Sequence, residues 1–403
     1  MWLDSNDHSD KFSAYDAIMA VGAHSSICTN DIVAFDQLQE FLDTTKDWCF
    51  GYLTYDLKNC LEDLESNNFD GLNFPQLFFF QPKKLFLVKD GQVEMSYISE
   101  FDREIKSDFK AITTVNLNET PANQHPKIKM RIHKEAYFTK VSQLLEHIHR
   151  GDLYEANFCQ EFYAEDLTID PVETFKNLNT ISQSPFSSYF KLENKFLLSA
   201  SPERFMKKAG STIISQPIKG TARRSNDKNE DERLIKALKN DEKERSENIM
   251  IVDLVRNDLS HHATPGSVVV TELCEVHSFL QVHQMISTIQ AQLTKNASSV
   301  DAIKQAFPMG SMTGAPKLSA MKIIEEIEAT KRGLYSGSVG YFKPDGDFDF
   351  NVVIRSILYN ANNKYVSFSV GSAITAKSNP QAEFEECLLK AKAMRQVLEN
   401  QRV

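Results

Sequence analysis

The chain has 403 residues, 41% of them hydrophobic and 25% charged, which is enough for a sizeable core and ordinary for a globular protein. Its 45 basic and 55 acidic side chains give a formal net charge of −10, which argues against a protein whose main partner is a nucleic acid. Six scattered cysteines without a CxxC pair argue against a zinc cluster and a disulfide framework. Because the acidic N-terminus resembles no signal peptide and no apolar run approaches about 18 residues, we expect a cytoplasmic protein without a membrane partner.

Residues 1–115 have the composition of a mixed strand and helix region. The stretches "WCFGYLTYDL" and "QLFFFQPKKLFLVKDGQVEMSYI" predict strands, and Asp90-Gly91 within the second predicts a tight hairpin turn. Residues 116–128 are polar and contain two prolines, which predicts a linker. A catalytic domain would then occupy residues 129–403.

The rest of the chain alternates between helical and strand patterns. "HKEAYFTKVSQLLEHIHRGD" predicts an amphipathic helix that ends at Gly151, and "SPFSSYFKLENKFLLSASPERF" predicts a strand hairpin. "APKLSAMKIIEEIEATKRG" predicts a helix with Pro316 near its start, basic residues in its last turn and Gly333 just past its end. Residues 335–374 have the pattern of an antiparallel meander, and "NPQAEFEECLLKAKAMRQVLEN" predicts a closing helix. Together these elements predict an α+β fold.

Two predicted helices carry glutamates at spacing i, i+3, which places each pair on one helix face. The pairs are Glu244 with Glu247 and Glu383 with Glu386. One reading is that they are solvated faces, as charge runs usually are. The other is that the two helices face each other and bind Mg²⁺, which prefers a few carboxylate oxygens and keeps several waters. Lys390, four residues after Glu386, is placed to pair with these carboxylates or to reach an anionic ligand.

Three further side chains each allow a structural and a functional reading. Lys219, in "QPIKGTARR", is either a surface lysine beside a turn or a lysine whose neutral form is favoured by an apolar pocket or by Mg²⁺, and which then acts as nucleophile or base. Arg355 is either an edge-strand arginine or a bidentate clamp for a carboxylate. His283 is either a core histidine or a general acid or base. "FPMGSMTGAPK" lacks the spacing of a phosphate loop, so a nucleoside triphosphate site is not expected.

Eight stretches resemble the chorismate-utilising enzymes and occur in the order typical of that family over about residues 130–400. They are "SASPERF", "QPIKGTARR", "KERSENIMIVDLVRNDLS", "VHQMIS", "PMGSMTGAPKLSAM", "RGLYSGSVGYF", "NVVIRS" and "AEFEECLLKAKA". The N-terminal third resembles the family more loosely, through "WLDSN" and "WCFGYLTYDL". The resemblance implies stacked antiparallel β-sheets with a sandwich-like core and helices outside, and a cleft that binds chorismate and Mg²⁺.

The resemblance also implies a role for each matched residue. Glu247 and Glu386 match the direct metal ligands, and Glu244 and Glu383 match neighbours that reach the metal through water. Glu203 matches the general acid that protonates the departing 4-hydroxyl, and His283 matches a catalytic histidine near the ring carboxylate. Positions that hold the substrate match Tyr335, Arg355, Lys390, Ser311 and the backbone at Gly371, Ser372 and Ala373, while Thr221 belongs to the catalytic lysine motif.

The lysine in Pro217-Ile218-Lys219-Gly220-Thr221 separates branches of the family. The anthranilate-forming branch has alanine at the position of Lys219, whereas the aminodeoxychorismate-forming branch has lysine. The resemblance then implies that Lys219 attacks C2 of chorismate, that ammonia displaces it at C4, and that the product leads to 4-aminobenzoate and folate. Because the family match uses nearly all of the chain, we expect ammonia from a separate glutamine amidotransferase subunit. The alternatives are an anthranilate synthase component, an isochorismate or salicylate synthase, and a chorismate-binding subunit without activity, which would have lost the glutamates.

Several positions depart from the family pattern. Glu155 stands where amination enzymes usually carry glutamine and isochorismate-type enzymes carry lysine. It is expected either to hold ammonia or ammonium near C2 or to act as a base on water. The other departures are Asn248, Ala222, Ala373 and Lys377.

Overall fold

A computed structural model describes residues 1–8, 11–114, 126–280 and 282–399. Most of the predicted linker, residues 116–125, lies outside the described residues. The predicted domain boundaries therefore stay a prediction. Within the described residues, strands before the predicted linker form hydrogen bonds with strands after it, because β1 (Trp2–Asp4) pairs with β8 (Phe186–Leu192) and β3 (Cys49–Leu53) pairs with β16 (Ser338–Phe342).

The remaining elements alternate along the chain. The other strands are β2 (Ala17–Thr29), β4 (Leu77–Lys89), β5 (Gln92–Tyr97), β6 (Lys129–Met130), β7 (Glu155–Ala164), β9 (Lys195–Ser201), β10 (Arg204–Ala209), β11 (Thr212–Gln216), β12 (Ile218–Arg223), β13 (Val269–Ser278), β14 (Val282–Gln292), β15 (Gly314–Ala315), β17 (Phe348–Val352), β18 (Ser356–Asn360) and β19 (Tyr365–Thr375). The α-helices are α1 (Ala34–Thr45), α2 (Ile105–Thr114), α3 (Lys134–Arg150), α4 (Pro171–Ser182), α5 (Lys228–Asn240), α6 (Glu242–Ser260), α7 (Ser299–Ala306), α8 (Lys317–Ile327) and α9 (Pro380–Glu399). Short 3₁₀ helices are η1 (Tyr55–Cys60), η2 (Ser99–Glu104) and η3 (Gly310–Met312).

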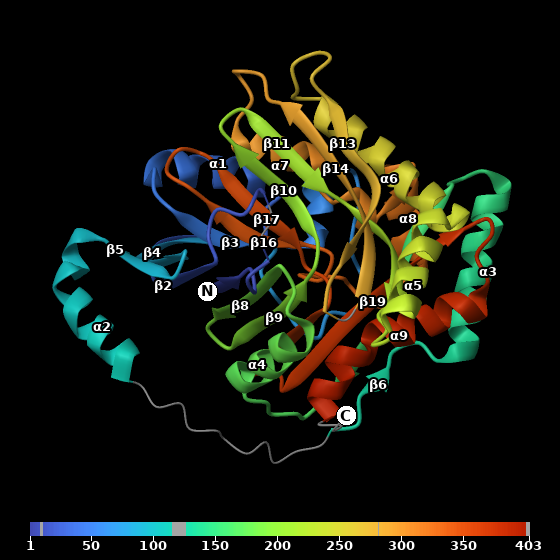
Figure 1. Cartoon of the computed structure of the whole chain (residues 1–403), viewed down its shortest axis with the longest axis horizontal. Helices are drawn as coiled ribbons and strands as arrows, with labels where there is room; N and C mark the ends of the chain where they lie inside the picture. Colours follow the sequence, from blue (N-terminus) through green and yellow to red (C-terminus); the bar gives the residue numbers. More distant parts are fainter. Residues whose placement is uncertain (9–10, 115–125, 281, 400–403) are drawn as a thin grey trace.

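The strands form one antiparallel sheet that curls over itself. Successive hydrogen-bonded neighbours are β14, β11, β10, β17, β16, β3, β4, β2, β1, β8, β9, β18, β19 and β7. Tyr52 of β3 and Phe190 of β8 are several strands apart in this order, yet their ring centroids lie 5.5 Å apart. Helices α5, α6, α8 and α9 gather along one side of the strands (Figure 1). The predicted α+β fold, with packed antiparallel sheet layers and outer helices, is confirmed.

The core explains why some strands read as unbroken apolar runs. Along β4 the side chains of Leu77 to Phe80 are all buried, because helices or other strands cover both faces of the sheet there. Local signals also act where predicted: Asp90 and Gly91 adopt positive φ between β4 and β5, and Gly151, with φ 93°, ends α3.

Two local predictions are wrong. The helix expected to run to Gly333 ends at Ile327, because Glu328 turns to an extended conformation and the chain brings Arg332 into the interior. There Arg332 forms an ion pair of 2.6 Å with Glu328 and donates to the carbonyl oxygens of Met312 and Asn157, contacts that a continued helix would not allow. Arg355 does not lie within a strand either: it connects β17 to β18 with φ 53°.

Candidate active site

The structure contains a cavity of about 610 Å³ between the β12–β14 edge of the sheet, the end of β19 and helices α6 and α9. Twelve of the sixteen predicted site residues line it: Glu203, Lys219, Thr221, Glu244, Glu247, Ser311, Tyr335, Arg355, Gly371, Ala373, Glu386 and Lys390. These residues come from segments nearly 190 positions apart in the chain. Glu155, His283, Ser372 and Glu383 do not line it.

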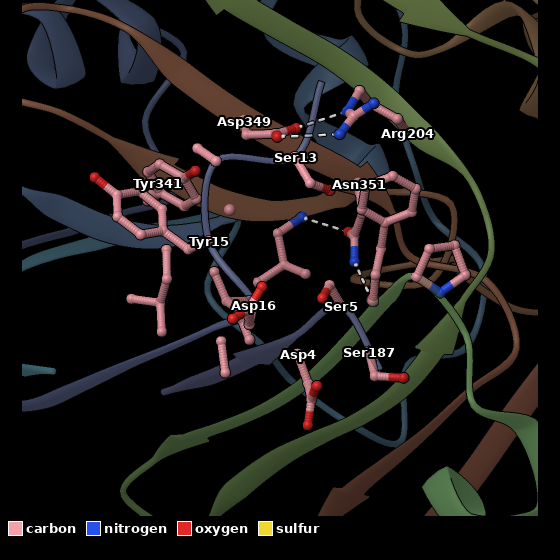
Figure 2. A pocket seen from close by; sticks show the side chains of 18 residues that line it. Asp4, Ser5, Ser13, Tyr15, Asp16, Ser187, Arg204, Tyr341, Asp349 and Asn351 are labelled. Carbon is pink, nitrogen blue, oxygen red and sulfur yellow. Dashed lines mark hydrogen bonds and ion pairs between the residues drawn. The ribbon is translucent and has the colours of Figure 1, made fainter. Parts of the chain in front are cut away.

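A second cavity, of about 70 Å³, lies on the other side of β10 beside β1 and β8 (Figure 2). Glu203 and Arg204 are consecutive where the chain enters β10, yet Glu203 lines the large cavity while Arg204 lines the small one. In the small cavity Arg204 is already bound to Asp349, with Nε 3.0 Å from Oδ1. The large cavity is therefore the candidate active site, since it gathers most of the predicted chemical groups.

Lys219 enters the cavity through a break in the register of β12. The pairing of β12 with β14 shifts between Ile218 and Thr221, and Gly220 has φ 93°. The positive φ favours glycine at this position, and a Cβ atom there would lie a tight 3.2 Å from Glu244 Oε2. The bulge turns the Lys219 side chain inward, where it is buried.

Lys219 is a paired ammonium group. Its Nζ donates to Glu155 Oε1 at 2.8 Å. Burial alone would lower the pKa of Lys219, but the carboxylates of Glu155 and Glu247 outweigh it and hold that pKa above the ordinary value of lysine. The expectation that an apolar pocket favours neutral Lys219 is therefore not met.

Glu203 has the environment of a general acid. Burial raises its pKa to about 7, although Ser311 Oγ donates to Glu203 Oε1 at 2.6 Å and opposes that shift. At neutral pH a carboxyl group with a pKa near 7 is protonated in a large fraction of the molecules. It also gives up that proton readily, so it can act as a general acid. Glu203 and Lys219 both line the cavity, so acid and amine face one space.

The glutamates of α6 and α9 face each other with lysines between them. Lys243 Nζ lies 3.0 Å from Glu383 and 3.7 Å from Glu247, while Lys390 Nζ lies 2.5 Å from Glu386. Burial raises the pKa of Glu247 to about 8, and its Oε1 has no hydrogen-bond partner among the described residues.

These carboxylates suit a hard divalent cation in chemistry, and Glu247 Oε1, which accepts no hydrogen bond among the described residues and has only the ion pair of 3.7 Å with Lys243, leaves a lone pair for a ligand bond. As arranged, however, no three acidic, histidine or cysteine side chains of the described residues form a cluster that could hold a metal. Lysines instead balance the charge of Glu383 and Glu386. The residues fit Mg²⁺ provided that Lys243 yields its position.

Arg355 is the cation in the cavity available to an anion. Its guanidinium makes no hydrogen bond or ion pair within the described residues, and burial lowers its pKa below the ordinary arginine value. Tyr335 lines the same cavity and contacts Cys159, whose Sγ lies 3.7 Å from its hydroxyl. A half-buried guanidinium that faces a cavity is a strong site for a carboxylate, which it can bind with two parallel hydrogen bonds.

His283 faces away from the cavity. It lies on β14 and is fully buried, with Nε2 2.9 Å from Asp231 and Nδ1 2.8 Å from Ser278. Its neighbour Gln284 lines the cavity, and Gln284 Oε1 is buried without a partner among the described residues. Gln284 was not predicted from the sequence. Side chains alternate along a strand, so Gln284 points to the opposite face of β14 from His283, but the sequence does not show which of these faces meets the cavity.

The other predicted residues outside the cavity support those inside it. Ser372 donates hydrogen bonds to Glu383 and Glu386, so its hydroxyl orients the carboxylates.

Lys243 was also not predicted from the sequence, although its spacing of four residues from Glu247 is the signal of a helical ion pair.

Two of the departures from the family pattern have a structural place. Asn248 is buried behind Lys219 and ties α6 to β12 and β14 by accepting from Ser287 and donating to the carbonyl oxygens of Lys219 and Met285. Lys377 is exposed and does not line the cavity, whereas Ala373 does.

Comparison with known proteins assigns the chain to a family. A family model described as chorismate binding enzyme matches residues 2–396. The chain belongs to the chorismate binding enzyme family. Within this family it is 41% identical over 266 residues to aminodeoxychorismate synthase component 1 of Escherichia coli (strain K12), which covers 66% of this chain and 58% of that relative. It is 33% identical over 375 residues to an anthranilate synthase component I-like protein of Synechocystis, which covers 92% of this chain and 76% of that relative.

A solved structure shows the same fold. Anthranilate synthase component I from Streptococcus pneumoniae superimposes with a TM-score of 0.83 at 24% identity, covering 96% of this chain and 94% of that one. At this identity the likeness concerns the fold alone. In the described part of the chorismate binding chain, no helix has the length and apolar character needed to cross a bilayer.

Proposed function

We propose that this chain replaces the 4-hydroxyl of chorismate by an amine and keeps the pyruvyl ether, forming 4-amino-4-deoxychorismate. The observation that carries the proposal is Lys219, which projects from a glycine-supported bulge into the cavity that also contains Glu203. The similarity to aminodeoxychorismate synthase component 1 of Escherichia coli supports it.

In the proposed reaction the amine of Lys219 bonds to C2 of chorismate while the two ring double bonds shift and the C4–O bond breaks. Glu203 donates its proton to the departing oxygen, which leaves as water. Ammonia then attacks C4, the two double bonds shift back, and Lys219 is expelled. Two displacements divide one difficult substitution into easier steps.

The site also has groups for the charges of the substrate. Arg355 and Lys390 line the cavity, and one guanidinium and one ammonium group match the two carboxylates of chorismate. Glu244, Glu247 and Glu386 would hold Mg²⁺ from the cavity side, with Glu383 behind them. When bound, the cation would supply positive charge to the region where negative charge is concentrated.

We further propose that ammonia comes from a separate glutamine amidotransferase subunit. The chain alone would then use ammonium but not glutamine, and adding a glutaminase subunit would make glutamine a substrate. Equal turnover of glutamine by the purified chain alone would contradict this part of the proposal.

The deciding experiment identifies the product. The purified chain is incubated with chorismate, Mg²⁺ and ammonium, and the products are analysed by mass spectrometry. A product that gains an amine and keeps the pyruvyl group supports the proposal. Anthranilate with released pyruvate would favour the anthranilate synthase alternative, an isomer of unchanged mass would favour the isochorismate branch, and the absence of turnover would favour a binding subunit.

A further inference from the structure

The proposed function leaves a difficulty at Lys219, and the inference rests on that function. An amine attacks carbon only when it is neutral, whereas the pKa of Lys219 is held above the ordinary lysine value by nearby carboxylates. In this chain, a neighbouring group that takes a proton from Lys219 and keeps it within reach would supply the neutral amine.

The carboxylates that face Lys219 come from four elements. Glu155 lies on β7, Glu247 on α6 and Glu386 on α9, while Glu203 follows β9. Of these, only Glu155 forms a hydrogen bond or an ion pair with Lys219 Nζ among the described residues. Glu203 is bound to Ser311 and serves as the acid in the proposed reaction.

Glu155 is placed behind Lys219 rather than beside the substrate. It begins β7, whose backbone pairs there with both β15 and β19, and its side chain is fully buried. Its Oε1 accepts from Lys219, and its Oε2 has no partner in the described part of the chain. Because Glu155 does not line the cavity, its carboxylate is not positioned to hold ammonia or to activate water there.

A buried pair with a single hydrogen bond can transfer a proton internally. Burial acts against the charged amine and the carboxylates around Lys219 oppose it, so the neutral amine is the minor form that a proton transfer must supply. A proton that moved along the contact of 2.8 Å would leave the net charge of the pair at zero.

We propose that Glu155 is the proton acceptor that converts Lys219 to its nucleophilic form. One N–H bond of Lys219 breaks and an O–H bond forms on Glu155 Oε1. The neutral amine then bonds to C2 of chorismate and becomes a secondary ammonium, while Glu203 gives its proton to the departing oxygen.

Glu155 holds its proton during the covalent stage and returns it afterwards. When ammonia bonds to C4, Lys219 leaves as a neutral amine and regains its proton from Glu155. The new C4 ammonium restores the proton of Glu203. No further proton donor or acceptor is needed, and water and the aminated product are released.

The test measures the first half of the reaction without ammonia. Chorismate and Mg²⁺ are mixed with enzyme, samples are quenched, and the covalent adduct is followed by intact-protein mass spectrometry between about pH 7 and 9. The wild-type chain is compared with Glu155→Gln, and the rate of the variant is divided by the wild-type rate at each pH. This ratio cancels the titration of Glu203, which both proteins share.

We expect the ratio to fall about tenfold for each pH unit below the pKa of Lys219 in the variant, because that lysine must lose its proton to bulk water. A ratio that is constant with pH overturns the inference, since a purely structural change lowers the rate equally at every pH. An absence of adduct in the wild-type chain overturns the proposed covalent reaction, and the inference with it. The two failures are therefore distinguishable.

Two further variants keep the test decisive. Glu161→Gln changes another buried glutamate of β7 that binds Arg131 and Tyr365 instead, and its ratio should not vary with pH. Glu155→Asp keeps a carboxylate but withdraws it from Lys219 by one methylene group. If Glu155→Gln does not fold, Glu155→Asp should form adduct about tenfold more slowly, and an unchanged rate overturns the inference.

Discussion

Lysine and glutamate meet in two different ways around the cavity. The sheet-side pair consists of Lys219 and Glu155, whose side chains are 10% and 0% exposed and are fixed by strands β12 and β7. The helix-side cluster consists of Lys243, Glu247, Glu383, Glu386 and Lys390 on α6 and α9, where Lys243 is 37% and Glu386 39% exposed. The sheet-side pair is enclosed throughout, whereas the helix-side cluster joins the buried carboxylates of Glu247 and Glu383, 8% and 2% exposed, to partners that reach solvent.

This difference separates two kinds of chemistry. In the sheet-side pair the Glu155 carboxylate has no hydrogen-bond partner but Lys219 among the described residues, so it can exchange a proton only with the lysine that lines the cavity. An open cluster on helices can exchange a lysine for a cation from solution, because exposed ion pairs contribute little stability and long side chains can leave. Substitutions on the sheet side should therefore abolish the reaction, whereas those on the helix side should shift its dependence on Mg²⁺.

The largest effect is expected for Lys219→Ala. Without the amine the proposed covalent route is lost, so the rate of amination should fall by about 10⁴-fold or more. The measurement is the initial rate of aminated product at saturating chorismate and ammonium. Unchanged product formation would rule out the covalent role.

Loss of folding must be separated from loss of chemistry in that variant. Lys207→Ala is a matched control, because Lys207 is also a buried sheet lysine and lies 3.4 Å from Asp349, away from the large cavity. Both variants should lower the melting temperature, since each removes a buried lysine from an ion pair, although Asp349 keeps its contact with Arg204. Only Lys219→Ala should remove amination.

A smaller effect is expected for Glu203→Gln. Removing a general acid should lower kcat/KM for chorismate by about 10²–10³-fold. In the wild-type chain the reactive form is the protonated acid, so kcat/KM should fall as pH rises through the Glu203 pKa of about 7, with the concentration of free ammonia held constant. This alkaline decline should be absent from the variant.

Ser311→Ala provides a companion test of the same group. The hydrogen bond from Ser311 lowers the pKa of Glu203, so its removal should move the alkaline decline to higher pH while activity is retained. A decline at unchanged pH would show that another group limits the reaction.

Local sequence signals predicted turns and helix ends correctly where these depend only on residues close together in the chain. The turn at Asp90-Gly91 and the end of α3 at Gly151 depend on glycine and its nearest neighbours, and both were predicted. The end of α8 was not, because a buried ion pair between Arg332 and Glu328 overrides the helix signal.

In the candidate site, too, the predictions failed where a feature depends on contacts between residues far apart in the chain. Most of the residues that motif resemblance identified, including Lys219, line the cavity. It placed His283 in the site, although the face of β14 that meets the cavity carries Gln284. Nor did it reveal that Glu155 seals Lys219 from behind, since that contact joins residues 64 positions apart.

On the helix side, Glu386→Gln should weaken Mg²⁺ binding rather than remove the reaction. Loss of one proposed carboxylate ligand should raise the Mg²⁺ concentration for half-maximal rate by about 10–100-fold. Glu385→Gln is the matched control, because Glu385 is exposed and binds Gln381 instead. Full activity of Glu386→Gln at low Mg²⁺ would show that the metal assignment is wrong.

The smallest effect, and the sharpest test of the open cluster, is expected for Lys243→Met. The carboxylates of Glu383 and Glu247 outweigh burial and hold the pKa of Lys243 above its ordinary value, so this ammonium competes with any cation for their oxygens. Its removal should lower the Mg²⁺ concentration for half-maximal rate by about threefold, the size expected for a partly exposed ion pair. Lys239→Met is the control, because Lys239 forms a similar ion pair with Glu275 on α5 and β13, outside the cavity. A higher Mg²⁺ requirement in Lys243→Met would mean that Lys243 organises the carboxylates rather than competing for them, and the contrast between a sealed pair and an exchangeable cluster would then fail.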